Sequence, residues 1–80
     1  MYVYFIRDDD TGMYLIGRMM LGAPVPTCVW GERRADALVY GSAAEARGVA
    51  LTMSGSVSIY RVKEDGSGPA KRIKFGGDRL

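Results

Sequence analysis

The stretch Ser42-Ala43-Ala44-Glu45 opens the clearest helix of this 80-residue chain. A serine at this position caps the first free backbone N–H groups, and a glutamate three residues later can reach back in a capping box. Apolar residues then recur at spacings of three and four, which gives one apolar stripe: Ala43, Ala46, Val49, Ala50 and Met53. The sequence therefore predicts a helix over residues 43–53, ended by Ser54-Gly55. Gly48 inside it indicates a close approach of another backbone.

The chain in front of this helix begins with a run, residues 2–7, that is apolar on both faces. Tyr2, Tyr4 and Ile6 alternate with Val3 and Phe5, so both faces carry large side chains. Such a pattern is typical of a strand in the middle of a sheet. The aspartates and glycine of residues 8–12 then predict a hairpin turn.

Further short extended runs lie at residues 13–18, 27–30, 37–40, 57–62 and 70–75. Residues 22–26 contain two prolines, which exclude a central strand there. We therefore expect one α+β domain over residues 1–80. Its architecture is a four- to five-stranded antiparallel sheet with the helix of residues 43–53 packed on one face.

The composition bounds the cellular setting. Cys28 is the only cysteine, so no internal disulfide can form, and the chain fits a reducing cytoplasm. The N-terminus enters directly into the first strand run without a signal peptide, and no apolar run reaches the roughly 20 residues that a membrane helix needs. We expect a soluble protein of the cytoplasm.

Catalytic chemistry has few candidates in this sequence. The chain has no histidine, so Cys28 lacks an obvious activating base. The paired carboxylates fall in predicted loops, where acids keep ordinary pKa values. A solvated turn is favoured over a metal site at Asp8 and Asp10, because the loop lacks the ligand alternation of a calcium loop. We expect no enzyme activity, no cofactor and no metal.

A nucleic-acid interface is one alternative. The chain has 11 basic and nine acidic side chains, a net charge of +2, and its C-terminal end is basic. Lys71, Arg72 and Lys74, with aromatic side chains on neighbouring strands, could form a basic face on which bases stack: Phe75, Tyr2, Tyr4 and Tyr60. A plain charged edge strand, which resists intermolecular pairing, explains the same residues.

Protein binding is the other alternative. One helix covers one sheet face, so the second face would carry apolar side chains toward water, a partner or a second copy of the chain. The competing interpretation is that residues 19–36 fold over this face and close a second small core with Met20, Leu21, Val25 and Trp30.

The order of elements also carries a resemblance. The chain has, in order, a tyrosine-rich strand, an Asp-Gly hairpin, Tyr40-Gly41-Ser42 before an alanine-rich helix, and the strand Ser58-Ile59-Tyr60-Arg61. This layout resembles the small phage- and mobile-element-encoded anti-CRISPR proteins of type I systems, the type I-C group first among them. The resemblance implies a non-enzymatic protein of the host bacterial cytoplasm. Such a protein binds the subunits of a CRISPR surveillance complex and blocks target DNA or nuclease recruitment.

Inhibitors that mimic DNA are strongly acidic, whereas this chain is slightly basic. A competitor of DNA would therefore have to engage a basic groove with local acidic clusters, Asp8, Asp9 and Asp10 together with Glu64 and Asp65. Trp30 and Tyr40 would add aromatic anchors. A small nucleic-acid-binding accessory protein and a structural or dimeric phage protein stay open as alternatives.

Overall fold

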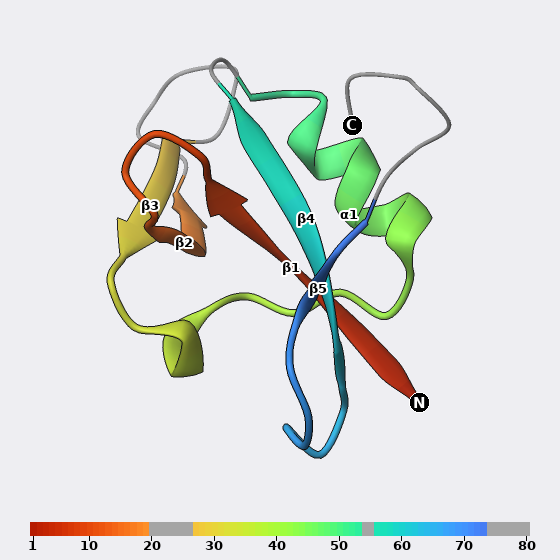
Figure 1. The fold of residues 1–80 in the computed structure, drawn as a ribbon. Helices are drawn as coiled ribbons and strands as arrows, with labels where there is room; N and C mark the ends of the chain where they lie inside the picture. The colour runs from red at the N-terminus through yellow and green to blue at the C-terminus, as the bar shows by residue number, and fades with distance from the viewer. Residues whose placement is uncertain (20–26, 54–55, 74–80) are drawn as a thin grey trace.

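The computed structural model describes residues 1–19, 27–53 and 56–73 (Figure 1). These residues form five strands, one 3-10 helix and one α-helix. In chain order they are β1 (Tyr2–Asp8), β2 (Tyr14–Met19), β3 (Thr27–Gly31), η1 (Arg34–Asp36), α1 (Ala43–Ala50), β4 (Val57–Lys63) and β5 (Lys71–Arg72). The strands make one antiparallel sheet in the order β3-β2-β1-β4-β5. The α+β prediction is confirmed, with β1 in the centre.

Helix α1 begins as predicted and ends earlier. The Ser42 backbone is extended, and its hydroxyl oxygen accepts a hydrogen bond from the Glu45 N–H at 3.1 Å. The helix ends at Ala50, because the following turn tightens: the Thr52 and Met53 N–H groups donate to carbonyls three residues earlier, at 3.1 Å each. The Thr52 hydroxyl also donates to the Val49 carbonyl at 2.7 Å. Residues 54–55, the predicted helix end, lie outside the described residues.

The explanation offered for Gly48 is wrong. A Cβ atom built on Gly48 meets nothing within 4 Å, and the residue is exposed. The close approach between helix and sheet occurs instead at Ala46 and Ala50, which are almost fully buried. No helix of the described residues is long and apolar enough to cross a membrane.

The main core lies between α1 and one face of the sheet. Its buried members are Ile6, Leu15, Ala46, Ala50, Val57 and Ile59. Along β1 and β4 successive side chains point to opposite faces of the sheet, so every second side chain of each strand points toward the helix. Burying a large aliphatic side chain contributes about 1.5–3 kcal/mol, so these few residues supply much of the stability of so small a sheet.

Strands β1 and β2 diverge after their hairpin, and residues 38–40 fill the gap. The two strands pair directly only at Arg7 and Tyr14. Farther along, Tyr4 and Tyr40 exchange two backbone hydrogen bonds of 3.0 and 2.8 Å, and the Leu38 N–H donates to the Leu15 carbonyl at 2.9 Å. The extended run predicted at residues 37–40 is therefore an insert between two strands rather than a simple lead into the helix.

The prediction for the last strand reaches beyond the described residues. Among the described residues β5 covers Lys71–Arg72, and the Ile73 N–H donates to the Ile59 carbonyl at 2.9 Å. Residues 74–75 of the predicted strand 70–75 lie outside the described residues. The second small core predicted from residues 19–36 is wrong at Trp30, which packs against the helix-side core. Its other predicted members, Met20, Leu21 and Val25, lie outside the described residues.

Candidate binding face

The sheet face opposite α1 gathers aromatic and arginine side chains from four strands and η1. Direct cross-strand partners share a face, and the pairs are Phe5 with Tyr60, Arg7 with Tyr14 on the same side, and Tyr60 with Arg72. Arg34 reaches the same group from η1. We call this set the aromatic–arginine face: Phe5, Arg7, Tyr14, Arg34, Tyr60 and Arg72.

Three rings form the centre of the aromatic–arginine face. The Phe5 and Tyr60 rings are nearly parallel, with centroids 5.4 Å apart and an interplanar angle of 9°. Tyr14 lies on the other side of Phe5, with centroids 5.6 Å apart and a tilt of 57°. Phe5 is 3% exposed, whereas Tyr14 and Tyr60 are half-buried. The buried Phe5 ring thus lies between two tyrosines that are only half-buried.

Arg7 is held in place by several groups. Its Nε donates to the Gly12 carbonyl at 3.2 Å, and its guanidinium lies 5.9 Å from the centroid of the Tyr14 ring. A side-chain hydrogen bond with Tyr60 raises the pKa of Arg7 above its ordinary value. Gly12 adopts a φ of +75°, and a Cβ there would lie 2.9 Å from an Arg7 nitrogen. A glycine at this turn can adopt the positive φ, and because it has no Cβ it leaves room for the Arg7 guanidinium.

Arg34 and Arg72 supply the exposed cations of the face. The Arg34 guanidinium lies 5.5 Å from the centroid of the Phe5 ring and covers it from η1. Beside it, Arg33 and Asp36 form an exposed ion pair of 3.9 Å. Arg72 is exposed on β5 next to Tyr60. A guanidinium over a ring keeps its N–H edge free to pair with an anion.

The acidic turn after β1 uses two of its three carboxylates locally. The Asp8 Oδ1 accepts from the Asp10 N–H at 2.8 Å and from the Thr11 N–H at 3.4 Å. The Asp9 Oδ1 accepts from the hydroxyl of Ser58, which is 1% exposed, at 2.7 Å. Asp10 is exposed. Asp8 and Asp9 therefore shape the turn and fasten it to β4, in addition to carrying charge.

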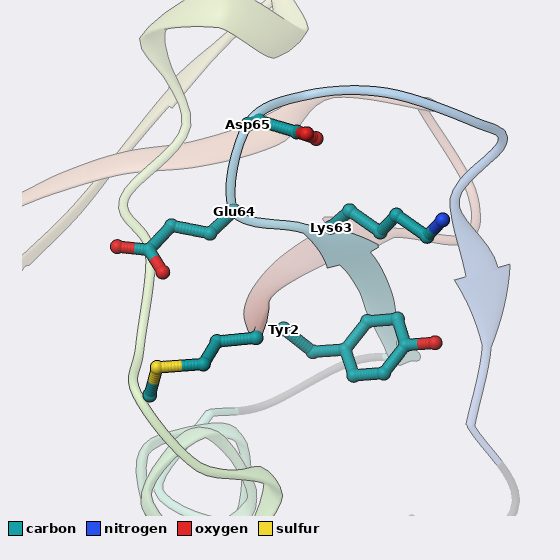
Figure 2. A pocket seen from close by; sticks show the side chains of 5 residues that line it. Tyr2, Lys63, Glu64 and Asp65 are labelled. Carbon is teal, nitrogen blue, oxygen red and sulfur yellow. The ribbon is translucent and has the colours of Figure 1, made fainter.

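Glu64 and Asp65 lie at the opposite end of the sheet, beside the N-terminus. With Met1, Tyr2 and Lys63 they line a hollow of about 470 Å³. In Figure 2 the Tyr2 ring and the Lys63 side chain extend to one side of this hollow, and the Glu64 carboxylate extends to the other.

Asp65 is tied to its own loop. Hydrogen bonds from the Ser67 side chain and N–H hold the pKa of Asp65 below its ordinary value. Since β1 and β4 run antiparallel from Tyr2 beside Lys63 to Asp8 beside Val57, the structure separates Glu64 and Asp65 from Asp8, Asp9 and Asp10 by the length of a strand.

The two predicted aromatic anchors, Trp30 and Tyr40, are half-buried against the helix-side core. Burial raises the pKa of Tyr40, with Arg18 lowering it in part. Cys28 is also half-buried and packs against the same core. These side chains lie on the other side of the sheet from the aromatic–arginine face.

The predicted basic patch is divided as well. Lys71 pairs with Arg61 and Arg72 pairs with Tyr60, so these neighbours point to opposite faces. Tyr4 packs against the helix-side core, and Tyr2 shares that side, with the Arg61 guanidinium 4.4 Å from its ring centroid. Lys74 and Phe75 lie outside the described residues.

Sequence reasoning missed Phe5, Arg7, Tyr14 and Arg34 as members of a joint surface. Alternation separates Phe5 from Ile6, but it does not show that Phe5 lies beside Tyr14, because that depends on how β1 pairs with β2. No local pattern could have placed Arg34, because its contact with Phe5 joins residues far apart in the chain.

Within residues 1–19, 27–53 and 56–73, no group of three or more histidine, cysteine, aspartate or glutamate side chains is placed to hold a metal ion. No protein-family model matches this chain, and neither a curated protein nor a solved structure is similar to it.

Proposed function

We propose that this protein is a non-enzymatic, phage-encoded inhibitor that binds directly to a type I CRISPR surveillance complex and blocks its binding of target DNA. The observation that supports the proposal best is the aromatic–arginine face. Tyrosine and arginine are among the residues that most often dominate the binding energy of macromolecular interfaces. Here they are clustered on the side of the sheet that α1 leaves uncovered.

The rigidity of the face adds to this support. Arg7 is bound to Gly12 and Tyr60, and both tyrosine rings lean on the buried Phe5 ring. Side chains that are already ordered lose less conformational entropy on binding. A small sheet can therefore present a surface that binds without a large rearrangement.

The charge of the face defines the partner surface. Three of its six members are arginines, and the nearby Asp9 carboxylate already accepts a hydrogen bond from Ser58. Electrostatic complementarity then calls for an anionic surface on the complex. An inhibitor seated on such a surface next to the DNA path would exclude the target strand sterically. In this arrangement Asp10 and Glu64, at the two ends of the sheet, pair with basic groups at the rim of that surface.

The test is capture of purified type I complexes, the type I-C complex first, by immobilised protein, together with a target-DNA binding assay. We expect wild-type protein to retain the complex and reduce DNA binding. The double variant Arg34→Gln/Arg72→Gln should lose both effects, whereas Lys71→Gln, which removes a charge from the opposite face, should keep them. No association at micromolar concentration would reject the proposal.

A further inference from the structure

We infer that the aromatic–arginine face binds single-stranded nucleic acid, with Tyr14 and Tyr60 stacking against bases and Arg34 and Arg72 pairing with phosphates. This inference rests on the proposed function, because it assumes that the face is the binding surface, and it names the chemistry of the occupant. In a surveillance complex the occupant would be an exposed guide or target strand.

The geometry of the rings is the first support. Tyr14 and Tyr60 flank Phe5 at centroid distances of 5.6 and 5.4 Å, and both tyrosines are only half-buried. Bases stack on aromatic side chains of an open sheet with little regard to sequence, since every base has a π-face. Phe5 is 3% exposed, so it supports the two tyrosine rings on either side of it and does not itself stack with a base.

The position of the cations is the second support. Arg72 is the cross-strand partner of Tyr60, and Arg34 covers the ring between the two tyrosines. Both side chains are exposed. Tyr14 has the Arg7 guanidinium 5.9 Å from its ring centroid. Both tyrosines thus have a guanidinium nearby, which is the arrangement that a strand of alternating bases and phosphates requires.

The charge of the face favours a nucleic acid as its occupant. Three of the six members are arginines and none is acidic, so the set carries only positive charge. A single strand offers anionic phosphates and flat bases together, which is the chemistry that these arginines and tyrosines match.

A single strand is favoured over a duplex for a geometric reason. Stacking on Tyr14 or Tyr60 needs the flat surface of a base, and in a duplex that surface is covered by the neighbouring base pairs. Duplex DNA could meet only the arginines. The face should therefore bind a single strand more tightly than a duplex, by the free energy that stacking on the tyrosine rings contributes.

The experiment measures binding of the purified full chain to a fluorescent oligothymidylate and oligouridylate of about 12 nucleotides and to a duplex of the same length, over a range of salt concentrations. We expect the single strands to bind more tightly than the duplex. Arg34→Gln and Arg72→Gln should each reduce the slope of log K against log salt by about 0.7. Tyr14→Leu and Tyr60→Leu should weaken binding about tenfold with the slope unchanged.

Matched controls lie on the opposite face. Lys71→Gln is the neighbour of Arg72 on β5, and Tyr2→Leu removes a ring on β1. Neither should change the affinity or the slope. Thermal unfolding by circular dichroism shows which variants are folded, and Tyr60→Phe, which keeps the ring, should bind like the wild type even if Tyr60→Leu unfolds.

Three outcomes would overturn the inference: no binding of either oligonucleotide at low salt, equal affinity for single strand and duplex, or an effect of Lys71→Gln as large as that of Arg72→Gln. If free oligonucleotides do not bind while Arg34→Gln/Arg72→Gln still abolishes capture of the CRISPR complex, the occupant is a protein and the proposed function survives. If neither complex nor oligonucleotide binds, both proposals fail.

Discussion

The two faces of the sheet differ in the types of side chain that they carry. On the helix side, Ile6, Leu15 and Ile59 are fully buried against the two buried alanines of α1, Ala46 and Ala50. On the other side, Phe5 is the buried ring, and arginines and half-buried tyrosines surround it. Helix α1 packs on one face, whereas the described residues place on the other face the Arg34 side chain of η1, which lies over Phe5.

This difference separates stability from binding. Aliphatic burial is non-directional and lasts as long as the helix is docked. A cation over a ring contributes only about 0.5–1 kcal/mol at an exposed site. An arginine can therefore exchange its ring contact for a contact with an anion, or with a different ring, at a small cost in free energy. The helix side is thus suited to hold the fold, and the aromatic–arginine face is suited to exchange partners.

The largest effect should come from the helix side. We expect Ile59→Ala to lower the free energy of unfolding by about 2–5 kcal/mol, because it leaves a cavity under α1. Val39→Ala removes an apolar side chain that is 59% exposed and should change it by less than about 0.5 kcal/mol. Urea unfolding measures both. A small effect of Ile59→Ala would contradict the assignment of this face as the main core.

A smaller loss should follow from cutting the link between the sheet and the acidic turn. Ser58→Ala removes the hydroxyl that donates to the Asp9 carboxylate at 2.7 Å, which should cost about 1–3 kcal/mol. Ser56 is exposed, and Ser56→Ala keeps the backbone carbonyl that accepts from the Asp9 N–H. The difference in melting temperature between the two variants isolates the side-chain bond. Equal melting temperatures would show that Asp9 is only a solvated turn residue.

The solvent side of α1 should tolerate, and even gain from, a larger residue. Gly48→Ala should raise the free energy of unfolding by up to about 1 kcal/mol, because alanine is the better helix former and its Cβ has open space. The reverse exchange at the exposed helix position Ala44, Ala44→Gly, should lower it by a similar amount. Denaturant titration compares the pair. Destabilisation by Gly48→Ala would mean that another segment approaches the helix there.

The smallest effect concerns alkaline pH at the rim of the helix side. Burial raises the pKa of Tyr40 above its ordinary value of 10.0, so above that pH the unfolded chain loses this proton more readily than the folded one. The contribution is complete below pH 10.0 and is lost as the pH rises through the higher folded pKa. Unfolding measured across this range should show the decline in the wild type and less of it in Tyr40→Phe. Identical pH profiles would contradict the burial of the phenol.

Much of the local fold followed from neighbours in the chain. Ser42 and Glu45 are three residues apart, so the cap could be read directly, and alternation at residues 2–7 placed Ile6 and Phe5 on opposite faces. The end of α1 could not be predicted, because it depends on where the backbone turn tightens, with the N–H groups of Thr52 and Met53 donating to carbonyls three residues earlier.

The candidate site was predictable only in part. The resemblance directed attention to Asp8, Asp9, Asp10, Glu64 and Asp65, yet the antiparallel pairing of β1 with β4 puts these two groups at opposite ends of the sheet. Arg72 was identified from the basic residues around it in the sequence, but on its face of the sheet it lies beside Tyr60, whereas Lys71 points to the opposite face. Pairing over such distances depends on strand register, which a run of residues does not reveal.

By itself, the order of residues determined the α+β class, the central position of the first strand and the start of the helix. These depend on hydrogen-bond caps and on periods of two and of three to four residues, which are properties of neighbouring positions. Only the tertiary structure decided that residues 38–40 separate β1 from β2 and that Arg34 lies over Phe5. Those contacts join segments that are distant in the chain, and the packing of the whole sheet selects them.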